Sequence, residues 1–282
     1  PVSRSTATLI WLFANKFLPL HFQNKTAMLF DKVIFGPIRS RRLGISLGVN
    51  LLPPTAKVCN FNCIYCECGW NTSGSKPALN SREEVATALR AKLTEMKAAG
   101  ECPDVITFAG NGEPTIHPEF EAIIDDTLAL RDELCPSAKV SVLSNATMLH
   151  REGVCRALRR VDNNILKLDS GIDATARLMN GPQQPDYSVA KVAERIAAFD
   201  GEAIVQTMFL RGEVNGAEVD NTTPEEVEAW LALVEQIRPR QVMIYTIDRA
   251  TPAPNLHKVT REELEVIAAR IEAMGIPCSV SA

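Results

Sequence analysis

Residues 44–66, GISLGVNLLPPTAKVCNFNCIYC, join a short apolar run to three closely spaced cysteines. The run at 45–51 has the length and composition of a buried strand. Cys59, Cys63 and Cys66 follow it in a C-x3-C-x2-C pattern. We therefore expect a strand whose carboxyl end leads into a ligand-binding loop.

The rest of the chain repeats this alternation of an apolar run with an amphipathic helical pattern. Further runs lie at 105–108, 140–143, 165–168, 204–210 and 242–247, and helical patterns lie near 81–99, 118–134, 150–160, 188–199, 224–237 and 260–274. Ser81, Thr223 and Thr260, each followed by glutamates, mark helix starts. Such βα repeats predict a parallel sheet in an α/β fold, here a partial (β/α)6 TIM-like barrel, with a doubly wound open sheet as the alternative. In such barrels the active site lies in the loops after the strands.

Composition excludes several classes of protein. The chain has 46% hydrophobic and 23% charged residues and a net charge of −4, which is unlike a disordered tail or a disulfide-dense miniprotein. The mildly acidic charge argues against a broad nucleic-acid-coating surface. No apolar run approaches the roughly 18–20 residues of a membrane span, so we expect no membrane contact.

The cysteines are distributed unevenly. Four lie within residues 59–68, and Cys102, Cys135, Cys155 and Cys278 are scattered. A cluster with isolated cysteines indicates a ligand site and buried thiols in a reducing compartment, hence a cytoplasmic protein.

The N-terminal residues 1–27 lack the regular pattern of the later sequence. They carry a five-residue apolar run and one early arginine, which is a weak signal for export. We expect an appendage outside a catalytic domain at 28–282, with an amphipathic helix packed on the core as the alternative.

The cysteine loop suits an iron–sulfur cluster. Three thiolates on one compact loop can hold three irons of a cubane and leave the fourth open to a small molecule. The alternative is structural zinc bound by Cys59, Cys63, Cys66 and Cys68, but structural zinc prefers two separated pairs of ligands.

A C-x3-C-x-aromatic-C loop after the first strand of an α/β repeat resembles the radical S-adenosylmethionine (SAM) superfamily. The resemblance covers about residues 36–282 and implies a barrel of the radical SAM type. It implies that Cys59, Cys63 and Cys66 bind a 4Fe–4S cluster, that SAM chelates the unique iron, and that Tyr65 lies beside the adenine. An external flavodoxin- or ferredoxin-like donor would supply one electron, SAM would yield a 5′-deoxyadenosyl radical, and the radical would abstract hydrogen from the substrate.

Later strand ends add to the resemblance. Gly110-Asn111-Gly112-Glu113-Pro114 is similar to the GGEP motif that receives the SAM amino group, and it departs from that motif at Asn111. Taken alone, this stretch is a glycine-rich turn. Ser144 and Asn145 are placed like residues that contact the SAM ribose and carboxylate, although a helix cap or Asx turn explains them equally well.

Charged residues at the remaining strand ends are candidate catalytic or substrate-binding groups. Lys167 and Asp169 share one face of a strand and either act on the substrate or pair with each other. Arg41, Arg42 and Arg249 are expected to contact an anionic substrate, although a short basic run is usually a solvated face.

The stretch 36–68 resembles the subgroup of wyosine-base-forming tRNA enzymes and of molybdopterin and nitrogenase-cofactor biosynthesis enzymes. No second cysteine cluster follows, which disfavours two-cluster enzymes. Three hypotheses result: a radical enzyme acting on an RNA base or small anionic metabolite, an activating enzyme that installs a glycyl radical in a partner protein, and a non-enzymatic iron–sulfur or zinc module.

Overall fold

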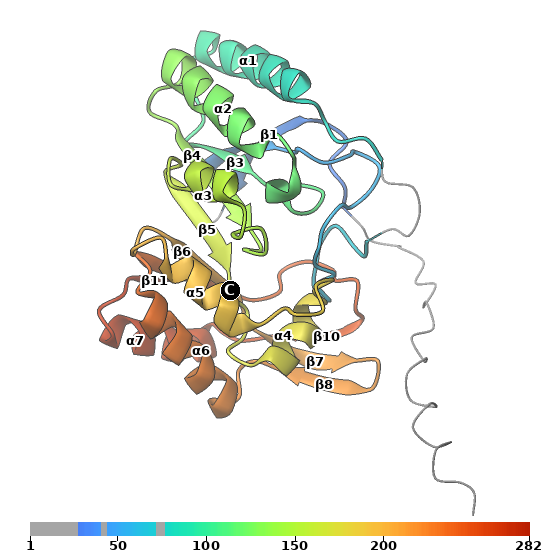
Figure 1. The fold of residues 1–282 in the computed structure, drawn as a ribbon, viewed down its shortest axis with the longest axis vertical. Coiled ribbons are helices and arrows are strands. Elements are labelled where there is room, and N and C mark those ends of the chain that lie inside the picture. Colours follow the sequence, from blue (N-terminus) through green and yellow to red (C-terminus); the bar gives the residue numbers. More distant parts are fainter. Residues whose placement is uncertain (1–27, 41–43, 72–76) are drawn as a thin grey trace, which may run out of the picture.

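The computed structural model describes residues 28–40, 44–71 and 77–282 (Figure 1). The expectations for residues 1–27, Arg41 and Arg42 therefore lie outside the described residues.

An eight-stranded sheet forms the centre of the fold, in the order β1-β2-β3-β4-β5-β6-β9-β11. Its strands are β1 (Ile34–Ser40), β2 (Gly44–Val49), β3 (Val105–Phe108), β4 (Lys139–Ser144), β5 (Asn163–Lys167), β6 (Ile204–Met208), β9 (Gln241–Tyr245) and β11 (Cys278–Ser281). Only the β1–β2 pair of this sheet is antiparallel. Consecutive parallel strands in an unbroken order confirm the partial barrel, because a doubly wound sheet reverses its strand order.

Helices cover one face of this sheet. They are α1 (Arg82–Ala98), α2 (Phe120–Leu134), α3 (Glu152–Leu158), α5 (Val189–Ala197), α6 (Pro224–Ile237) and α7 (Arg261–Ala273). Helix α4 (Asp173–Asn180) packs instead against the cysteine loop. Figure 1 shows α1 to α3 beside the first strands and α5 to α7 beside the later ones. The predicted helix starts are confirmed: Ser81 and Thr260 form capping boxes with Glu84 and Glu263, and the Thr223 side chain accepts from the Glu226 N–H.

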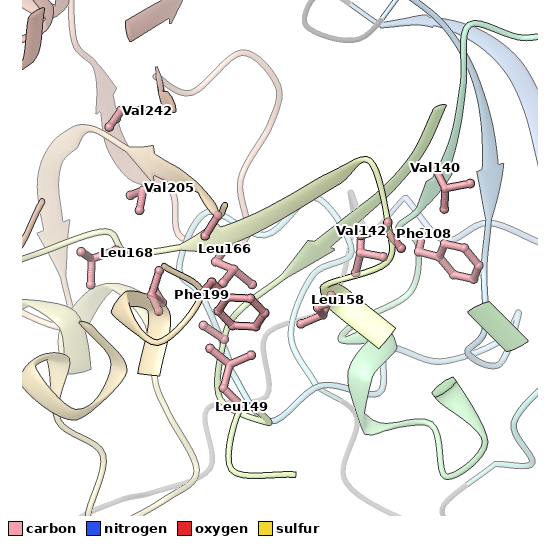
Figure 2. Packing of buried hydrophobic residues seen from close by; sticks show 14 of the residues in the cluster. Phe108, Val140, Val142, Leu149, Leu158, Leu166, Leu168, Phe199, Val205 and Val242 are labelled. Carbon is pink, nitrogen blue, oxygen red and sulfur yellow. The ribbon is translucent and has the colours of Figure 1, made fainter. Parts of the chain in front are cut away.

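The main core lies between the sheet and these helices. Strand residues such as Phe108, Val142 and Leu166 pack against Leu158 and Phe199 from the helical layer (Figure 2). The opposite face of the strands carries a smaller apolar cluster of Ile165, Ile204 and Met243. Since side chains alternate along a strand, residues two positions further along point into the barrel above this cluster.

Some elements were not predicted. β1 and β11 extend the sheet at its two edges, and α4 follows β5 directly. β7 (Leu210–Val214), β8 (Ala217–Asp220) and β10 (Asn255–Lys258) form a separate sheet in the order β10-β7-β8. These short, half-exposed strands lack the apolar pattern that marks a buried strand.

The isolated cysteines also differ from expectation. Cys102 and Cys135, predicted as buried thiols, form a disulfide between the segment before β3 and the end of α2. They are 33 residues apart in the sequence, so no local spacing pattern marks the pair. Among the described residues, no helix combines the length and apolar character needed to cross a bilayer.

Candidate functional site

The cysteine loop is attached to the turn after β3. The Val58 N–H donates to the Asn111 carbonyl at 2.8 Å, and the Glu113 N–H donates to the Val58 carbonyl at 3.1 Å. Gly112 makes this approach possible, since its φ is +137° and a Cβ there would lie 1.9 Å from the Val58 oxygen. The first two predicted motifs are therefore adjacent in space.

The three cysteines open onto one cavity of about 260 Å³. Polar side chains from several strand ends line it with them: Lys57, Glu67, Glu113, Ser144, Asn145, Lys167, Gln206 and Tyr245. Tyr65, Gly110 and Gly112 also line it, as do Phe61 and Met208. The cavity lies at the carboxyl ends of the parallel strands, where a barrel is expected to carry its active site.

Each thiol has a nearby hydrogen-bond donor. The Phe61 N–H donates to Cys59 Sγ at 3.3 Å, and Asn145 Nδ2 lies 3.6 Å from the same sulfur. Asn180 Nδ2 lies 3.6 Å from Cys63 Sγ. Beside Cys66 lie the charge of Lys57 and the Cys68 thiol, which donates to the Gly110 carbonyl at 3.2 Å.

These contacts separate the ionisation of the three cysteines. Burial raises the pKa of Cys59 to about 12 and that of Cys63 to about 11. The neighbouring Cys68 thiol, followed by the charge of Lys57, lowers the pKa of Cys66 to about 5 against the effect of burial. The pKa of Cys68 itself is raised, with Cys66 as the first cause.

The donor set fits a cluster better than a single ion. Among the described residues, no three His, Cys, Asp or Glu side chains converge on one metal position. A cubane takes one thiolate per iron, so its ligands need not converge, whereas zinc requires a tetrahedral set. Cys59, Cys63 and Cys66 line the cavity and Cys68 does not, so the three residues expected to hold a cluster share the cavity without the fourth cysteine of the zinc alternative.

Glu113 is buried, with 2% of its surface exposed, and is held by four donors. Its carboxylate accepts from the N–H and hydroxyl of Thr115, from Ser144 Oγ at 2.9 Å and from the Asn145 N–H at 2.6 Å. Burial raises the pKa of Glu113, and these hydrogen bonds act in the opposite direction. A cation bound in the cavity would lower the pKa of Glu113 and favour its carboxylate form.

Ser144 and Asn145, which end β4, are likewise engaged with their neighbours. Asn145 Nδ2 donates to Asn60 Oδ1 at 2.7 Å, and Asn145 Oδ1 accepts from the Thr147 N–H and hydroxyl. Asn145 therefore joins the β4 end to the cysteine loop, and it faces the cavity from there.

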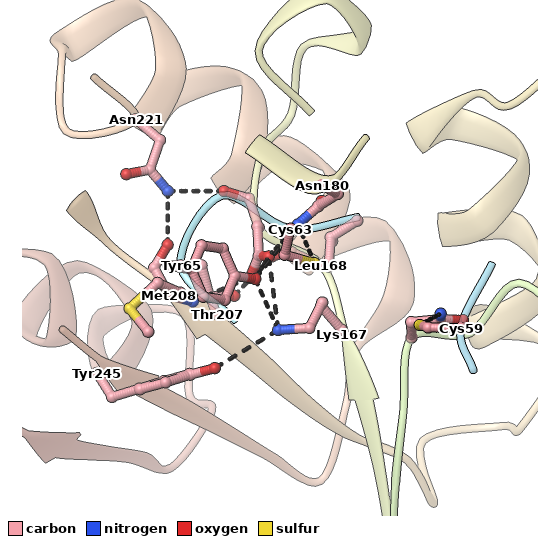
Figure 3. Close-up of polar contacts among 12 residues, drawn as sticks. Cys59, Cys63, Tyr65, Lys167, Leu168, Asn180, Thr207, Met208, Asn221 and Tyr245 are labelled. Carbon is pink, nitrogen blue, oxygen red and sulfur yellow. Dashed lines mark hydrogen bonds and ion pairs between the residues drawn. The ribbon is translucent and has the colours of Figure 1, made fainter. Parts of the chain in front are cut away.

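Tyr65 and Lys167 (Figure 3) form a polar network with the buried Asp169. The Tyr65 hydroxyl donates to Asp169, and Lys167 Nζ donates to Tyr65 Oη at 2.9 Å and lies 3.5 Å from Asp169 Oδ2. Asn180 Nδ2 and the Met208 N–H also donate to Asp169. Lys167 and Asp169 therefore pair with each other, and only Lys167 of the two lines the cavity.

Lys167 remains a cation in this network. Burial acts to lower its pKa, but Asp169 and Tyr245 outweigh burial, and the pKa of Lys167 is raised above its ordinary value. Its ammonium lies over the Tyr65 ring, 5.1 Å from the centroid. Tyr65 was expected beside an adenine, and the structure shows that its hydroxyl also orients the Lys167–Asp169 pair.

Two predicted residues point away from the cavity. The Asn111 side chain is fully buried and forms hydrogen bonds with the backbone of Phe30 and Pro53. It thereby anchors the chain before β1, which a glycine at this position could not do. Arg249 forms an exposed ion pair with Glu67 at the cavity edge. Neither side chain lines the cavity, so neither is placed to contact a molecule inside it.

Sequence reasoning missed Lys57, Gln206 and Tyr245. Gln206 gave a usable signal, because it is the one amide in the apolar run 204–210. It is paired in register with Lys167 and lies two residues after Ile204, so it points into the barrel. Lys57 had only its position two residues before Cys59 as a signal.

Comparison with known proteins gives one family and several relatives. The radical SAM superfamily profile matches residues 54–223. A UPF0026 protein of Helicobacter pylori is 31% identical over 233 residues, which are 79% of this chain and 70% of that protein. A protein of Brachyspira hyodysenteriae named GTPase Obg is 31% identical over 257 residues, 89% of this chain, and this chain spans 35% of its length.

Solved structures share the fold at low sequence identity. A radical SAM methyltransferase from Sphaerobacter thermophilus superposes with a TM-score of 0.62 at 16% identity, over 84% of this chain and 65% of that one. SuiB of Streptococcus suis bound to SAM gives 0.58 at 13% identity, over 83% and 50%. TYW1 with a lysine–pyruvate adduct gives 0.57 at 15%, over 81% and 73%.

The family match and the cavity refer to the same residues. The profile covers the cysteine loop, the Glu113 turn, the end of β4 and Lys167. The chain belongs to the radical SAM superfamily of enzymes.

Proposed function

We propose that the chain reductively cleaves SAM and uses the resulting radical to abstract hydrogen from a small anionic metabolite. The observation that carries this proposal is a single cavity lined by three cysteines, by Glu113 with Asn145, and by the Lys167 cation. The cysteines would bind iron, Glu113 with Asn145 would bind SAM, and Lys167 would bind the substrate.

When bound, a 4Fe–4S cluster and SAM supply a 5′-deoxyadenosyl radical after one electron has entered. Cys59, Cys63 and Cys66 would hold three irons. The Glu113 carboxylate, held by four donors, would accept the SAM ammonium. Asn145 and Ser144, which fix Glu113, would lie against the rest of the amino-acid portion of SAM.

The opposite side of the cavity would bind the substrate. Lys167 and Gln206 are register partners on β5 and β6, and Tyr245 ends β9 beside them. The Gln206 amide lines the cavity without a hydrogen bond to any other described residue. A cation next to a free amide suits a carboxylate or phosphate oxygen.

Lys167 would act as a fixed charge. The TYW1 structure carries a lysine–pyruvate adduct, but imine formation needs a neutral amine. Because its pKa is raised, Lys167 stays an ammonium near neutral pH, so it would bind an anion electrostatically. We propose Lys167 for the role first expected of Arg249, which is paired with Glu67.

A metabolite is favoured over RNA by the net charge of the chain and by the pairing of several of its arginines. The chain is acidic overall, and several arginines on its helices are paired with carboxylates, among them Arg82, Arg90, Arg156 and Arg270. Nucleic-acid binding relies on unpaired cations. The electron would come from a flavodoxin- or ferredoxin-like donor in the cytoplasm.

Anaerobic reconstitution with iron and sulfide tests the proposal. With dithionite and SAM we expect methionine and 5′-deoxyadenosine from the wild type and from Cys155→Ala, and no iron or product from Cys63→Ala. Deuterium should reach 5′-deoxyadenosine from a deuterated metabolite pool. Deuterium from labelled RNA instead would establish the RNA reading, a glycyl radical on a partner protein would establish the activating enzyme, and a cluster that never cleaves SAM would leave a binding module.

A further inference from the structure

Lys57 lines the same cavity without a role in holding iron, SAM or substrate. It precedes Val58, whose backbone is clamped to the Gly112 turn, so the position of Lys57 is set by the fold. Its Nζ donates to the Gly69 carbonyl at 2.9 Å, across the turn that follows Cys66. Cys66 lines the same cavity, and its charge acts to raise the pKa of Lys57.

This cation is buried without a carboxylate partner. Lys57 is 4% exposed, and among the described residues no Asp or Glu forms an ion pair with it. A buried ammonium costs several kcal/mol unless negative charge lies nearby. Cys66, whose pKa is lowered, supplies negative charge near Lys57 in the metal-free protein, and Cys59 and Cys63 would add to it as thiolates when iron is bound.

The other donors to the cysteines carry no net charge. Cys59 and Cys63 receive amide N–H groups from Phe61, Asn145 and Asn180. Lys167 faces Cys63 as well, but Asp169 lies 3.5 Å from its ammonium and offsets the charge. Lys57 is therefore the unbalanced positive charge beside the three ligands, within the part of the chain that the structure describes.

We propose that Lys57 raises the reduction potential of the cluster bound by Cys59, Cys63 and Cys66, an inference that rests on the proposed function. One electron from the external donor adds one negative charge to the cluster. A fixed cation that lines the same cavity as the ligand sulfurs stabilises the more negative state, and net charge near a cluster is a known determinant of its potential. Lys57 thereby brings electron entry within reach of a flavodoxin- or ferredoxin-like donor.

A redox titration of the reconstituted protein, followed by electron paramagnetic resonance without SAM or substrate, tests this role. We expect a more negative midpoint potential in Lys57→Gln, which removes the charge but keeps a donor for the Gly69 carbonyl. Lys57→Arg should stay near the wild type. Lys92→Gln, which removes a half-buried cation paired with Glu95 on α1, is the matched control and should not move the potential.

A wild-type potential in Lys57→Gln with full iron content would overturn the inference. A second measurement keeps the positive charge at position 57. In protein labelled with 15N-lysine, electron spin-echo modulation of the reduced cluster should show a coupling to a lysine nitrogen. This coupling should disappear in Lys57→Arg. Absence of that coupling from the wild type counts equally against Lys57. If the wild type holds no 4Fe–4S cluster, the proposed function itself fails, and the two failures are thus distinguishable.

Discussion

At the scale of single residues, the three cysteines differ in the ease with which they lose a proton. The Cys68 thiol and the Lys57 charge lower the pKa of Cys66. For Cys59 and Cys63, burial is the largest effect and raises the pKa of both. The Cys66 thiolate is therefore available for the first iron, while the other two must release protons as iron binds.

This difference predicts a pH profile for the metal-free protein. The pKa of Cys66 is lowered to about 5, so its thiolate is present above that pH and is lost only as pH falls through it. Alkylation of Cys66 by iodoacetamide should change little between pH 6 and 8, as measured by peptide mass spectrometry. Cys155, whose pKa is raised by burial, should react about tenfold faster per pH unit.

Cys68→Ala is the informative variant for this profile. Removal of the Cys68 thiol should raise the pKa of Cys66 and slow alkylation of Cys66 at pH 6. The reconstituted variant should nevertheless keep its 4Fe–4S cluster. Complete loss of metal in Cys68→Ala, with zinc in the wild type, would instead support the four-cysteine zinc site.

Lys167→Gln should separate SAM cleavage from substrate turnover. Asp169 keeps donors from Tyr65, Asn180 and the Met208 N–H, so the fold should tolerate the change. Loss of the pair between the Lys167 ammonium and the substrate anion should cost roughly 2–5 kcal/mol, or about 30-fold or more in substrate binding. Uncoupled cleavage to 5′-deoxyadenosine should stay near the wild-type rate, while deuterium transfer from the metabolite pool should fall.

Lys258→Gln, an exposed cation on β10, is the control for Lys167→Gln and should change neither readout. Parallel loss of cleavage and transfer in Lys167→Gln would place Lys167 in the SAM site and contradict the anion-binding role.

At the scale of elements, a short parallel bridge between the cysteine loop and the turn after β3 joins the iron ligands to Glu113. Only a residue without Cβ permits that bridge, because the Val58 carbonyl lies against Gly112. The geometry of the site thus depends on an approach of two backbones that no helix or strand pattern reveals.

Gly112→Ala should therefore damage both fold and site. A Cβ 1.9 Å from a backbone oxygen forces the two segments apart, and we expect a loss of about 3 kcal/mol or more in the free energy of unfolding. Gly100→Ala is the matched control: its φ of +73° is also positive, but nothing lies within 4 Å, so strain alone should cost roughly 1 kcal/mol. Urea unfolding compares the two, and equal losses would show that the close approach is unimportant.

At the scale of the whole molecule, the disulfide between Cys102 and Cys135 constrains the first half of the barrel. It joins the segment that enters β3 to the end of α2, and Cys135 is fully buried. Closing a loop of 33 residues stabilises a fold by about 4 kcal/mol in the chain-entropy account.

Urea unfolding with and without a reductant should show that contribution as a lower midpoint after reduction. The double variant Cys102→Ala/Cys135→Ala should be equally stable in both conditions. An unchanged wild-type midpoint, with both thiols shown to be free, would mean that this bond contributes little to stability.

Sequence patterns alone predicted the parallel barrel, its six principal βα units and the loop of three cysteines that lines the cavity. These features depend on local periodicity and on spacing along the chain, which hydrophobic patterns and a three-cysteine loop record directly. Helix starts such as Ser81 and Thr260 were equally readable, because a cap bonds within three residues. The exposed strands β7, β8 and β10 were missed because they bury too little to leave a pattern.

Only the tertiary structure decided which polar residues share the cavity. The cavity brings together side chains from segments that span nearly 190 residues of the sequence, namely Lys57, Gln206 and Tyr245. By contrast, Asn111 bonds to Phe30 and Arg249 pairs with Glu67. Strand register placed Lys167 next to Gln206, and the Asp169 network then fixed its charge. Burial and the proximity of distant groups determine the chemistry of such side chains, and both arise only when the chain has folded.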